Sequence, residues 1–148
     1  MKLKKILRII LIICLILITI DQTSKVLINH NLQEDVELIP GFLNITKVKN
    51  EGMSFGINKQ NLGNIGLTII ILVAIFNYII SQKENMNAKI IIFLSFIIAG
   101  GISNLIDRIF KGAVFDFIQI GEFPVFNIAD CFIVIRLVII CYKFYCFF

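Results

Sequence analysis

Charged residues are scarce in this chain, because Asp, Glu, Lys and Arg together make up 16% of its 148 residues. Hydrophobic residues make up 58%, whereas a soluble domain is about 45–50% apolar and about 25% charged. This balance excludes an ordinary water-soluble domain and indicates a membrane protein. At this length the chain has room for a single domain, residues 1–148, and not for two separate cores.

Side chains suited to metal binding or nucleophilic attack are also scarce. The chain has one histidine, His30, and its four cysteines show no C-x-x-C spacing. The sequence contains no zinc-protease spacing, no G-x-S-x-G and no Cys–His pair. We therefore expect no metal, no cofactor and no serine or cysteine nucleophile. The cysteines lie within or beside apolar runs, where cysteine behaves as a small apolar residue.

Four apolar runs are long enough to cross a bilayer as helices, which takes roughly 17–25 residues each. They cover about residues 6–28, 62–80, 88–109 and 126–148. Between the first and the second, two strand-like runs flank Pro40-Gly41, which is a turn pair. The predicted fold is an all-α membrane protein with four transmembrane helices and a small β-containing element between the first two.

The distribution of basic residues predicts the orientation. Lys2, Lys4, Lys5 and Arg8 crowd the start of the chain, directly before the first apolar run. The positive-inside rule places such a segment in the cytoplasm. Four spans then return the C-terminus to the cytoplasm, so that both longer connections face outward. The basic segment leads into apolar sequence, which argues against a nucleic-acid partner. The first span has no small-x-small cleavage site and is expected to remain as an anchor.

Four aspartates lie near the expected outer ends of the spans: Asp21, Asp107, Asp116 and Asp130. An acid inside a span costs about 2.5–3.5 kcal/mol on insertion scales and is usually paired or functional. Taken singly, three of them have a structural explanation: Asp107 pairs with Arg108, Asp116 is an exposed loop acid, and Asp130 caps a helix. Together they predict two carboxyl groups that share one proton, one activating a water and the other polarising a peptide carbonyl.

The third span carries polar and small residues at helical spacing. Gly100, Ser103, Asn104 and Asp107 recur every three or four residues and so share one face. Small residues on such a face allow close helix packing, and the polar ones can bond to neighbouring helices.

Five segments, in this order, resemble the lipoprotein signal peptidases, also called signal peptidase II. They are Asp21-Gln22-Thr23-Ser24-Lys25, Asn50-Glu51-Gly52-Met53-Ser54-Phe55, the run from Gly100 to Arg108, Val114-Phe115-Asp116-Phe117 and Phe126-Asn127-Ile128-Ala129-Asp130. Each segment alone is a weak signal, but the five together within a four-span chain are specific. The resemblance covers about Asp21 to Asp130.

The resemblance implies that Asp116 and Asp130 are the catalytic pair. It also implies a set of substrate-binding or site-supporting residues, namely Asp21, Lys25, Asn50, Gly52, Asn104, Asp107, Arg108 and Asn127. The implied activity is that of an aspartic endopeptidase of the bacterial inner membrane, with its site at the outer face. Its substrates would be diacylglyceryl-modified prolipoproteins, cut just before the lipidated cysteine, and we expect a monomer surrounded by lipid.

Two other functions remain open on the sequence. A small transporter subunit would also carry acids within its spans, although it would place them near the bilayer midplane and in repeated halves. A catalytically inactive scaffold that binds lipoproteins is the other, and Arg136 within the fourth span is the feature that favours it.

Overall fold

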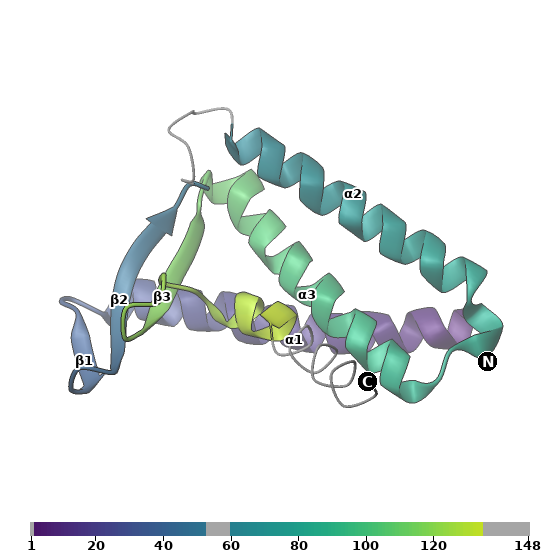
Figure 1. Cartoon of the computed structure of the whole chain (residues 1–148), viewed down its shortest axis with the longest axis horizontal. Helices are drawn as coiled ribbons and strands as arrows, with labels where there is room; N and C mark the ends of the chain where they lie inside the picture. The colour runs from purple at the N-terminus through teal and green to yellow at the C-terminus, as the bar shows by residue number, and fades with distance from the viewer. Residues whose placement is uncertain (1, 53–59, 135–148) are drawn as a thin grey trace, which may run out of the picture.

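The computed structural model describes residues 2–52 and 60–134. Long helices lie side by side, and a small sheet stands at one end of them (Figure 1). The elements in chain order are α1 (Leu3–Asn31), β1 (Val36–Ile39), β2 (Leu43–Asn50), α2 (Gln60–Ser81), the short 3₁₀ helix η1 (Lys83–Asn85), α3 (Ala88–Lys111) and β3 (Val114–Ile120). A further helix begins after Asn127 and is described over residues 128–134.

Helix α1 buries one face along its whole length. Its buried residues follow each other at intervals of three or four: Ile6, Ile10, Cys14, Leu17, Asp21 and Lys25. The first four belong to the main apolar core, together with residues of α3 such as Ile91, Leu94 and Ala99. Because the same face continues from apolar into charged residues, the packing that forms the core also carries Asp21 and Lys25 into the interior. Cys14 lies in this core, as predicted for an apolar cysteine.

Helix α3 packs against both α1 and α2. It begins where the Asn87 side chain accepts a hydrogen bond from the Ile90 amide at 3.0 Å, and it ends at Gly112 with φ +77°. A side-chain oxygen at the helix start satisfies an otherwise unpaired N–H, and glycine adopts the left-handed end without strain. The two ends therefore limit α3 to the segment that carries Ser103, Asn104 and Asp107.

Two helices among the described residues are long and apolar enough to cross a membrane, Leu62–Ser81 and Ala88–Lys111. Large apolar side chains of α2 are widely exposed, among them Ile70 at 66% and Val73 at 54%. Lipid in place of water removes the cost of that exposure. The expected spans 6–28, 62–80 and 88–109 coincide with α1, α2 and α3 within a few residues. Most of the expected fourth span, 126–148, lies outside the described residues.

The sheet has three antiparallel strands in the order β1-β2-β3. The hairpin of β1 and β2 turns at Pro40-Gly41, where Gly41 has φ +68°, as the turn pair predicted. The third strand is a correction, because the sequence placed the β element only between the first two helices. Residues 114–120 instead pair with β2, with Asp116 opposite Val48 and Asn50 opposite Val114. The sheet therefore joins the connection between α1 and α2 to the segment that follows α3.

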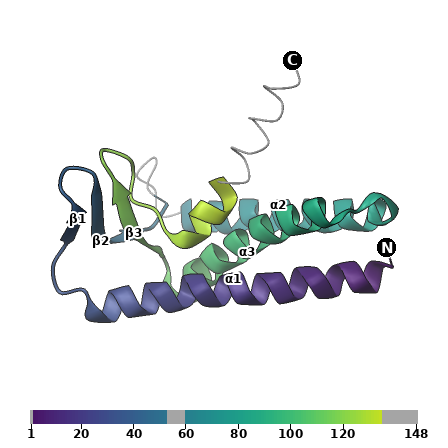
Figure 2. The ribbon, with the colours of Figure 1, turned by 90° about the horizontal axis from the view of Figure 1, so that it is seen from below.

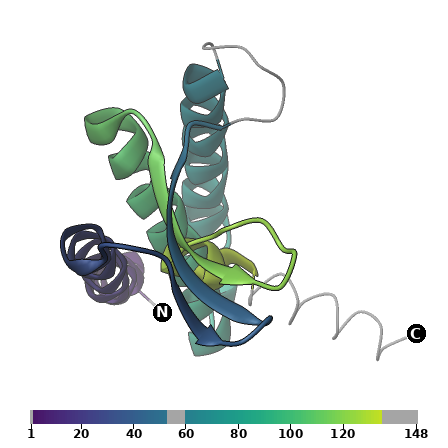
Figure 3. The same ribbon diagram turned by 90° about the vertical axis from the view of Figure 1, so that its left-hand side faces the viewer.

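The helices and the sheet define two ends of the molecule. The N-terminus of α1 and the connection between α2 and α3 lie at one end, and the sheet lies at the other (Figure 2). Viewed from the sheet end, the strands cross in front of the helices (Figure 3). Gly100 of α3 lies against the helix that follows Asn127, because a Cβ added there would be 2.6 Å from the Ala129 carbonyl oxygen. Glycine therefore sets the distance between these two helices.

Candidate active site

Asp116 lies on β3 and is buried, with 1% of its surface exposed. Each carboxylate oxygen accepts a hydrogen bond from an asparagine amide: Oδ1 from Asn127 Nδ2 at 2.6 Å, and Oδ2 from Asn50 Nδ2 at 2.8 Å. Burial raises the pKa of the Asp116 carboxyl, and the nearby charge of Asp130 raises it further against the opposing effect of the two amide donors. The explanation of Asp116 as an exposed loop acid is therefore wrong.

Asp130 lies at the start of the helix over residues 128–134. Asn127 Oδ1 accepts the Asp130 amide at 3.0 Å, and Asp130 Oδ2 accepts the Asn127 amide at 3.2 Å. This reciprocal pair is a capping box, in which Asn127 is the cap and Asp130 the third residue of the helix. The second carboxylate oxygen, Oδ1, accepts from Asn104 Nδ2 at 2.8 Å. The side chain of Asp130 is half-buried.

Asn127 connects the two carboxyl groups. Its Nδ2 donates to Asp116 and also to Asn104 Oδ1 at 3.1 Å, while its Oδ1 accepts from the backbone of Asp130. The side chain is fully buried. Both hydrogens of the amide and its oxygen are thus occupied, which fixes the rotamer of Asn127. Asp116 and Asp130 consequently hold a defined position relative to each other.

Asn50 is oriented by the backbone that follows β2. The Gly52 amide donates to Asn50 Oδ1 at 2.9 Å, and Gly52 has φ +86°. A side-chain carbonyl that accepts the amide two residues on forms an Asx turn, and only glycine adopts this φ without strain. The turn directs the Nδ2 of Asn50 toward Asp116. This explains why the sequence places Asn50 and Gly52 two residues apart.

A buried ion cluster lies next to the two carboxyl groups. Lys25 is 1% exposed, and its Nζ lies 2.7 Å from Asp21 Oδ2 and 2.7 Å from Asp107 Oδ2. The same Nζ donates to Asn104 Oδ1 at 3.2 Å. Lys25 therefore contacts Asn104, the residue whose Nδ2 donates to Asp130. Asp21 adds a link to the last helix, because its Oδ1 accepts the Ala129 amide at 2.9 Å.

Asp107 does not pair with Arg108, contrary to the expectation from their adjacency. Its partners are Lys25 and Lys111, whose Nζ lies 2.7 Å from Asp107 Oδ1. Neighbouring residues on a helix point in different directions, whereas residues four apart share a face. Arg108 lies within electrostatic reach of Asp130 and Asp116 and, to a lesser degree, of Asp107. Its Nε is buried without a hydrogen-bond partner among the described residues.

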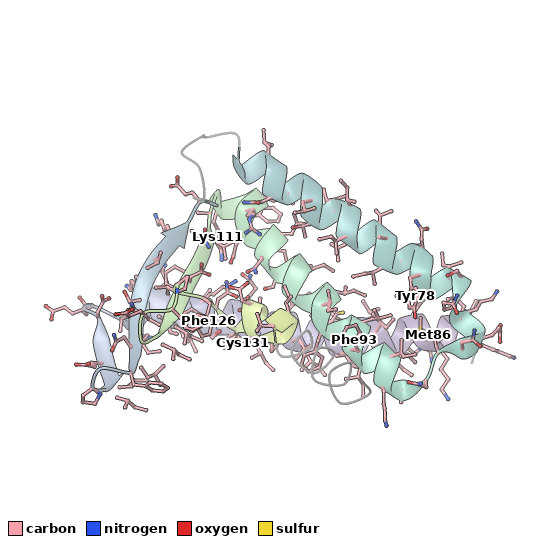
Figure 4. All side chains as sticks on the ribbon, in the orientation of Figure 1. Tyr78, Met86, Phe93, Lys111, Phe126 and Cys131 are labelled. Atoms are coloured by element: carbon pink, nitrogen blue, oxygen red, sulfur yellow. The ribbon has the colours of Figure 1, made fainter. Side chains whose placement is uncertain are left out.

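The structure thus brings together the site residues predicted from the sequence. Eight of the ten belong to one hydrogen-bonded network: Asp21, Lys25, Asn50, Asn104, Asp107, Asp116, Asn127 and Asp130. Gly52 joins through its backbone amide and Arg108 through its charge. The network lies at the sheet end of the helices, where Lys111 and Phe126 are also found (Figure 4).

The prediction missed three side chains of the network. Ser103 Oγ donates to Asp21 Oδ2 at 2.6 Å, and Gln22 Nε2 donates to Ser103 Oγ at 3.0 Å and to Asp107 Oδ1 at 3.2 Å. Lys111 is the third. The spacing of Lys111, four residues after Asp107, was the available signal, and Ser103 already stood on the polar face of the third span.

An apolar pocket adjoins Asp130. It has a volume of about 560 Å³, and Asp130 is the charged residue in its lining. The other lining residues are Ile120, Phe123, Pro124, Val125, Phe126, Cys131 and Val134. Its size lies within the range of small-ligand pockets, roughly 300–1,000 Å³. Acyl chains or apolar side chains fit such walls, directly beside a carboxyl group.

Comparison with known proteins gives consistent results. A family model described as Signal peptidase (SPase) II matches residues 13–146. The chain is 37% identical over 138 residues to a lipoprotein signal peptidase of Staphylococcus haemolyticus, covering 88% of this chain and 86% of the relative. It is 34% identical over 140 residues to one of Moorella thermoacetica, covering 90% of each. A solved bacterial membrane enzyme, determined in meso at 1.9 Å, is 32% identical with a TM-score of 0.80 over 91% of each chain.

Proposed function

Because the chain belongs to the signal peptidase II family, an aspartic peptidase that removes signal peptides from prolipoproteins, we propose that Asp116 and Asp130 form its catalytic pair. The observation that carries this assignment is the shared contact with Asn127, which bonds to the side chain of one and to the backbone and side chain of the other. Two carboxyl groups so joined, at the end of an apolar helix bundle, suit hydrolysis of a peptide bond by a shared proton.

The surroundings of the two carboxyl groups assign them different roles. Asp116 is almost fully buried and its pKa is raised, so it holds the proton and donates it to the scissile carbonyl oxygen. Asp130 is half-buried at the start of a helix and is the more accessible of the two carboxyl groups to a water. Asp130 therefore takes the proton of the attacking water. The positive charge of Arg108 stabilises the negative charge that this pair carries.

The neighbouring apolar pocket supports a lipid-modified substrate. A prolipoprotein carrying diacylglycerol on its cysteine would place acyl chains against walls such as Phe123 and Phe126, while the bond before that cysteine meets Asp130. Lipid chains anchor the substrate at the level where the sheet meets the helices. The transporter alternative requires acids at the bilayer midplane, whereas this network lies at one end of the helices, beside the sheet (Figure 4).

The same premise supports a four-span arrangement in the inner membrane. The N-terminus of α1 and the α2–α3 connection lie at the end opposite the sheet (Figure 2). That end carries Lys2, Lys4, Lys5, Arg8, Lys83 and Lys89. An excess of basic residues marks the cytoplasmic side, so the sheet and the carboxyl pair face outward. The fourth helix would continue from residues 128–134 back toward the cytoplasm.

The decisive experiment compares cleavage of a diacylated prolipoprotein with that of the same substrate without lipid, by gel shift with purified protein. We expect cleavage of the lipidated form, and a fall in rate of about 10³-fold in both Asp116→Asn and Asp130→Asn, because each removes one role in proton transfer. Asp35→Asn is the matched control, since Asp35 is an exposed aspartate on the connection between α1 and β1.

Two results would contradict the assignment. Persistent cleavage by Asp116→Asn would show that this carboxyl group is dispensable for the reaction. Equal loss in Asp35→Asn would show that the assay reports a general effect of removing acids. Binding of the substrate by a well-folded wild-type protein without any cleavage would favour the inactive scaffold instead.

A further inference from the structure

A second pocket lies on the other side of β3 from the carboxyl pair. Its volume is about 580 Å³. The residues that line it come from the ends of α1 and α3, from the link between α3 and β3, and from β2 and β3: Lys25, Val26, Asn29, His30, Lys49, Lys111, Ala113 and Phe115. Three of the eight are lysines and none is acidic. Lys25 and Lys111 also belong to the network that supports the active site, whereas the other six lining residues have no part in the proposed peptidase chemistry.

The sheet places the strand wall of this pocket on the face opposite the carboxyl pair. Successive residues of a strand point to opposite faces, so Phe115 lies on the face opposite Asp116. Lys49 is the residue paired with Phe115 across the two strands. Phe115 also stacks on Phe117, two residues on, with ring centroids 6.1 Å apart. The pocket is therefore bounded by the sheet face that turns away from Asp116.

Two of the lysines are exposed to solvent at the pocket. Lys49 is exposed and forms no ion pair with any residue in the ranges 2–52 and 60–134. Lys111 is held in place by Asp107 at 2.7 Å and by Gln22 Oε1 at 3.2 Å, yet its side chain remains 45% exposed. By contrast, the ammonium group of Lys25 is enclosed by Asp21 and Asp107. Lys49 therefore brings a positive charge without an acidic partner among the described residues to the open side of the pocket.

The end of α1 does not cancel this charge. Carbonyl groups at a helix C-terminus repel anions, but the Asn29 carbonyl accepts a hydrogen bond from Lys47 Nζ at 2.8 Å. A second carbonyl near this end, that of Leu27, accepts a hydrogen bond from the Asn31 side chain at 2.9 Å. Both of these carbonyl oxygens are thereby occupied, and Lys47 brings a further positive charge to the same helix end.

Besides the lysines, the pocket is lined by the apolar residues Val26, Ala113 and Phe115 and by the polar residues Asn29 and His30. Val26 is 60% exposed on α1, and Ala113 and Phe115 form the wall toward β3. A positively charged mouth above an apolar wall, at the end of apolar helices, matches the division of a phospholipid into headgroup and acyl chain. We propose that this pocket binds the phosphate group of an anionic membrane phospholipid. The proposal rests on the placement of the sheet at the membrane interface described above.

The test measures lipid retention on the purified full-length protein by native mass spectrometry, with phosphatidylglycerol and phosphatidylcholine of equal chain length as probes. We expect preferential retention of phosphatidylglycerol, which Lys49→Gln lowers about five-fold, since one basic residue near a membrane surface contributes about that factor. The preference should also weaken at high salt, because exposed charges are screened. Lys83→Gln is the matched control, as Lys83 is exposed at the opposite end of the molecule.

Equal retention of the two lipids would overturn the proposal, as would an equal loss in Lys49→Gln and Lys83→Gln. If inorganic phosphate bound to lipid-free protein while phosphatidylglycerol was not preferred, the ligand would be a soluble anion and the lipid assignment would be wrong. The outcome is separable from the peptidase assignment. A protein that cleaves prolipoprotein but retains the two phospholipids equally refutes only the proposal for this pocket. The Lys49→Gln variant is expected to cleave prolipoprotein at the wild-type rate.

Discussion

The contact between Gly100 and the last described helix offers a quantitative test of how the active site is positioned. Gly100 lies on α3, four residues before Asn104, and a Cβ at this position would approach Ala129 and Ile133. Ala129 directly precedes Asp130. Replacing Gly100 with alanine should therefore push the segment that carries one catalytic carboxyl group away from the helix that carries its hydrogen-bond donor.

The size of the displacement follows from the distances. The added Cβ would lie 2.6 Å from the Ala129 oxygen and 2.8 Å from Ile133 Cγ1, whereas ordinary contact begins at 3.4 Å, so the helices must separate by about 0.8 Å. The Ile133 side chain can rotate, but the backbone oxygen cannot. A misplacement of about 1 Å costs on the order of 10²-fold in rate, and overpacking costs about 1–3 kcal/mol of stability. We expect Gly100→Ala to lose about 10²-fold in kcat.

Gly101→Ala is the matched control. It is the adjacent residue on the same helix, and its Cβ would meet Leu72 Cδ2 and Thr68 Cγ2 at 3.7 Å, which is ordinary contact. The two variants should be compared for kcat and KM on lipidated prolipoprotein, and for thermal unfolding in the same detergent. A Gly100→Ala protein with the wild-type kcat, or an equal loss in Gly101→Ala, would refute the argument that this close approach positions Asp130.

Three further predictions follow from the network. Lys25→Met should destabilise the protein by about 3–5 kcal/mol, because it leaves two buried carboxylates without their cation; thermal unfolding should show a much smaller effect for the half-exposed Lys111→Met. The rate should show a bell-shaped dependence on pH, and Asn50→Ala should move the alkaline limb of this profile to higher pH. The Asn50 amide lowers the Asp116 pKa, so without it the Asp116 carboxyl stays protonated to higher pH. An unchanged alkaline limb would show that Asp116 is not the group that titrates there. EDTA should leave the rate unchanged, and a chelator-sensitive rate would contradict proton transfer by two carboxyl groups alone.

Much of the architecture followed from the sequence because it depends on short-range patterns. The lengths of the apolar runs predicted α1, α2 and α3 within a few residues, since each run must cover the thickness of a bilayer. Pro40-Gly41 between two strand-like runs predicted the hairpin. Spacing along the third span predicted that Ser103, Asn104 and Asp107 share one face, and in the structure that face is buried. The five ordered motifs gave the family, which the comparisons show independently.

The tertiary structure alone decided how these pieces meet. Residues 114–120 became a strand because β2 offers them a pairing edge 64 to 77 positions away in the chain, as in the pairs Asn50–Val114 and Leu43–Ile120. That pairing buries Asp116, a carboxyl group that sequence alone left as a possible loop acid. Asp107 turned from its neighbour Arg108 toward Lys25 and Lys111 for a similar reason, because partners in a folded chain are chosen by direction and distance. The sequence determined which residues are present, and the packing of α1, α3 and β3 around Asn127 determined what they do together.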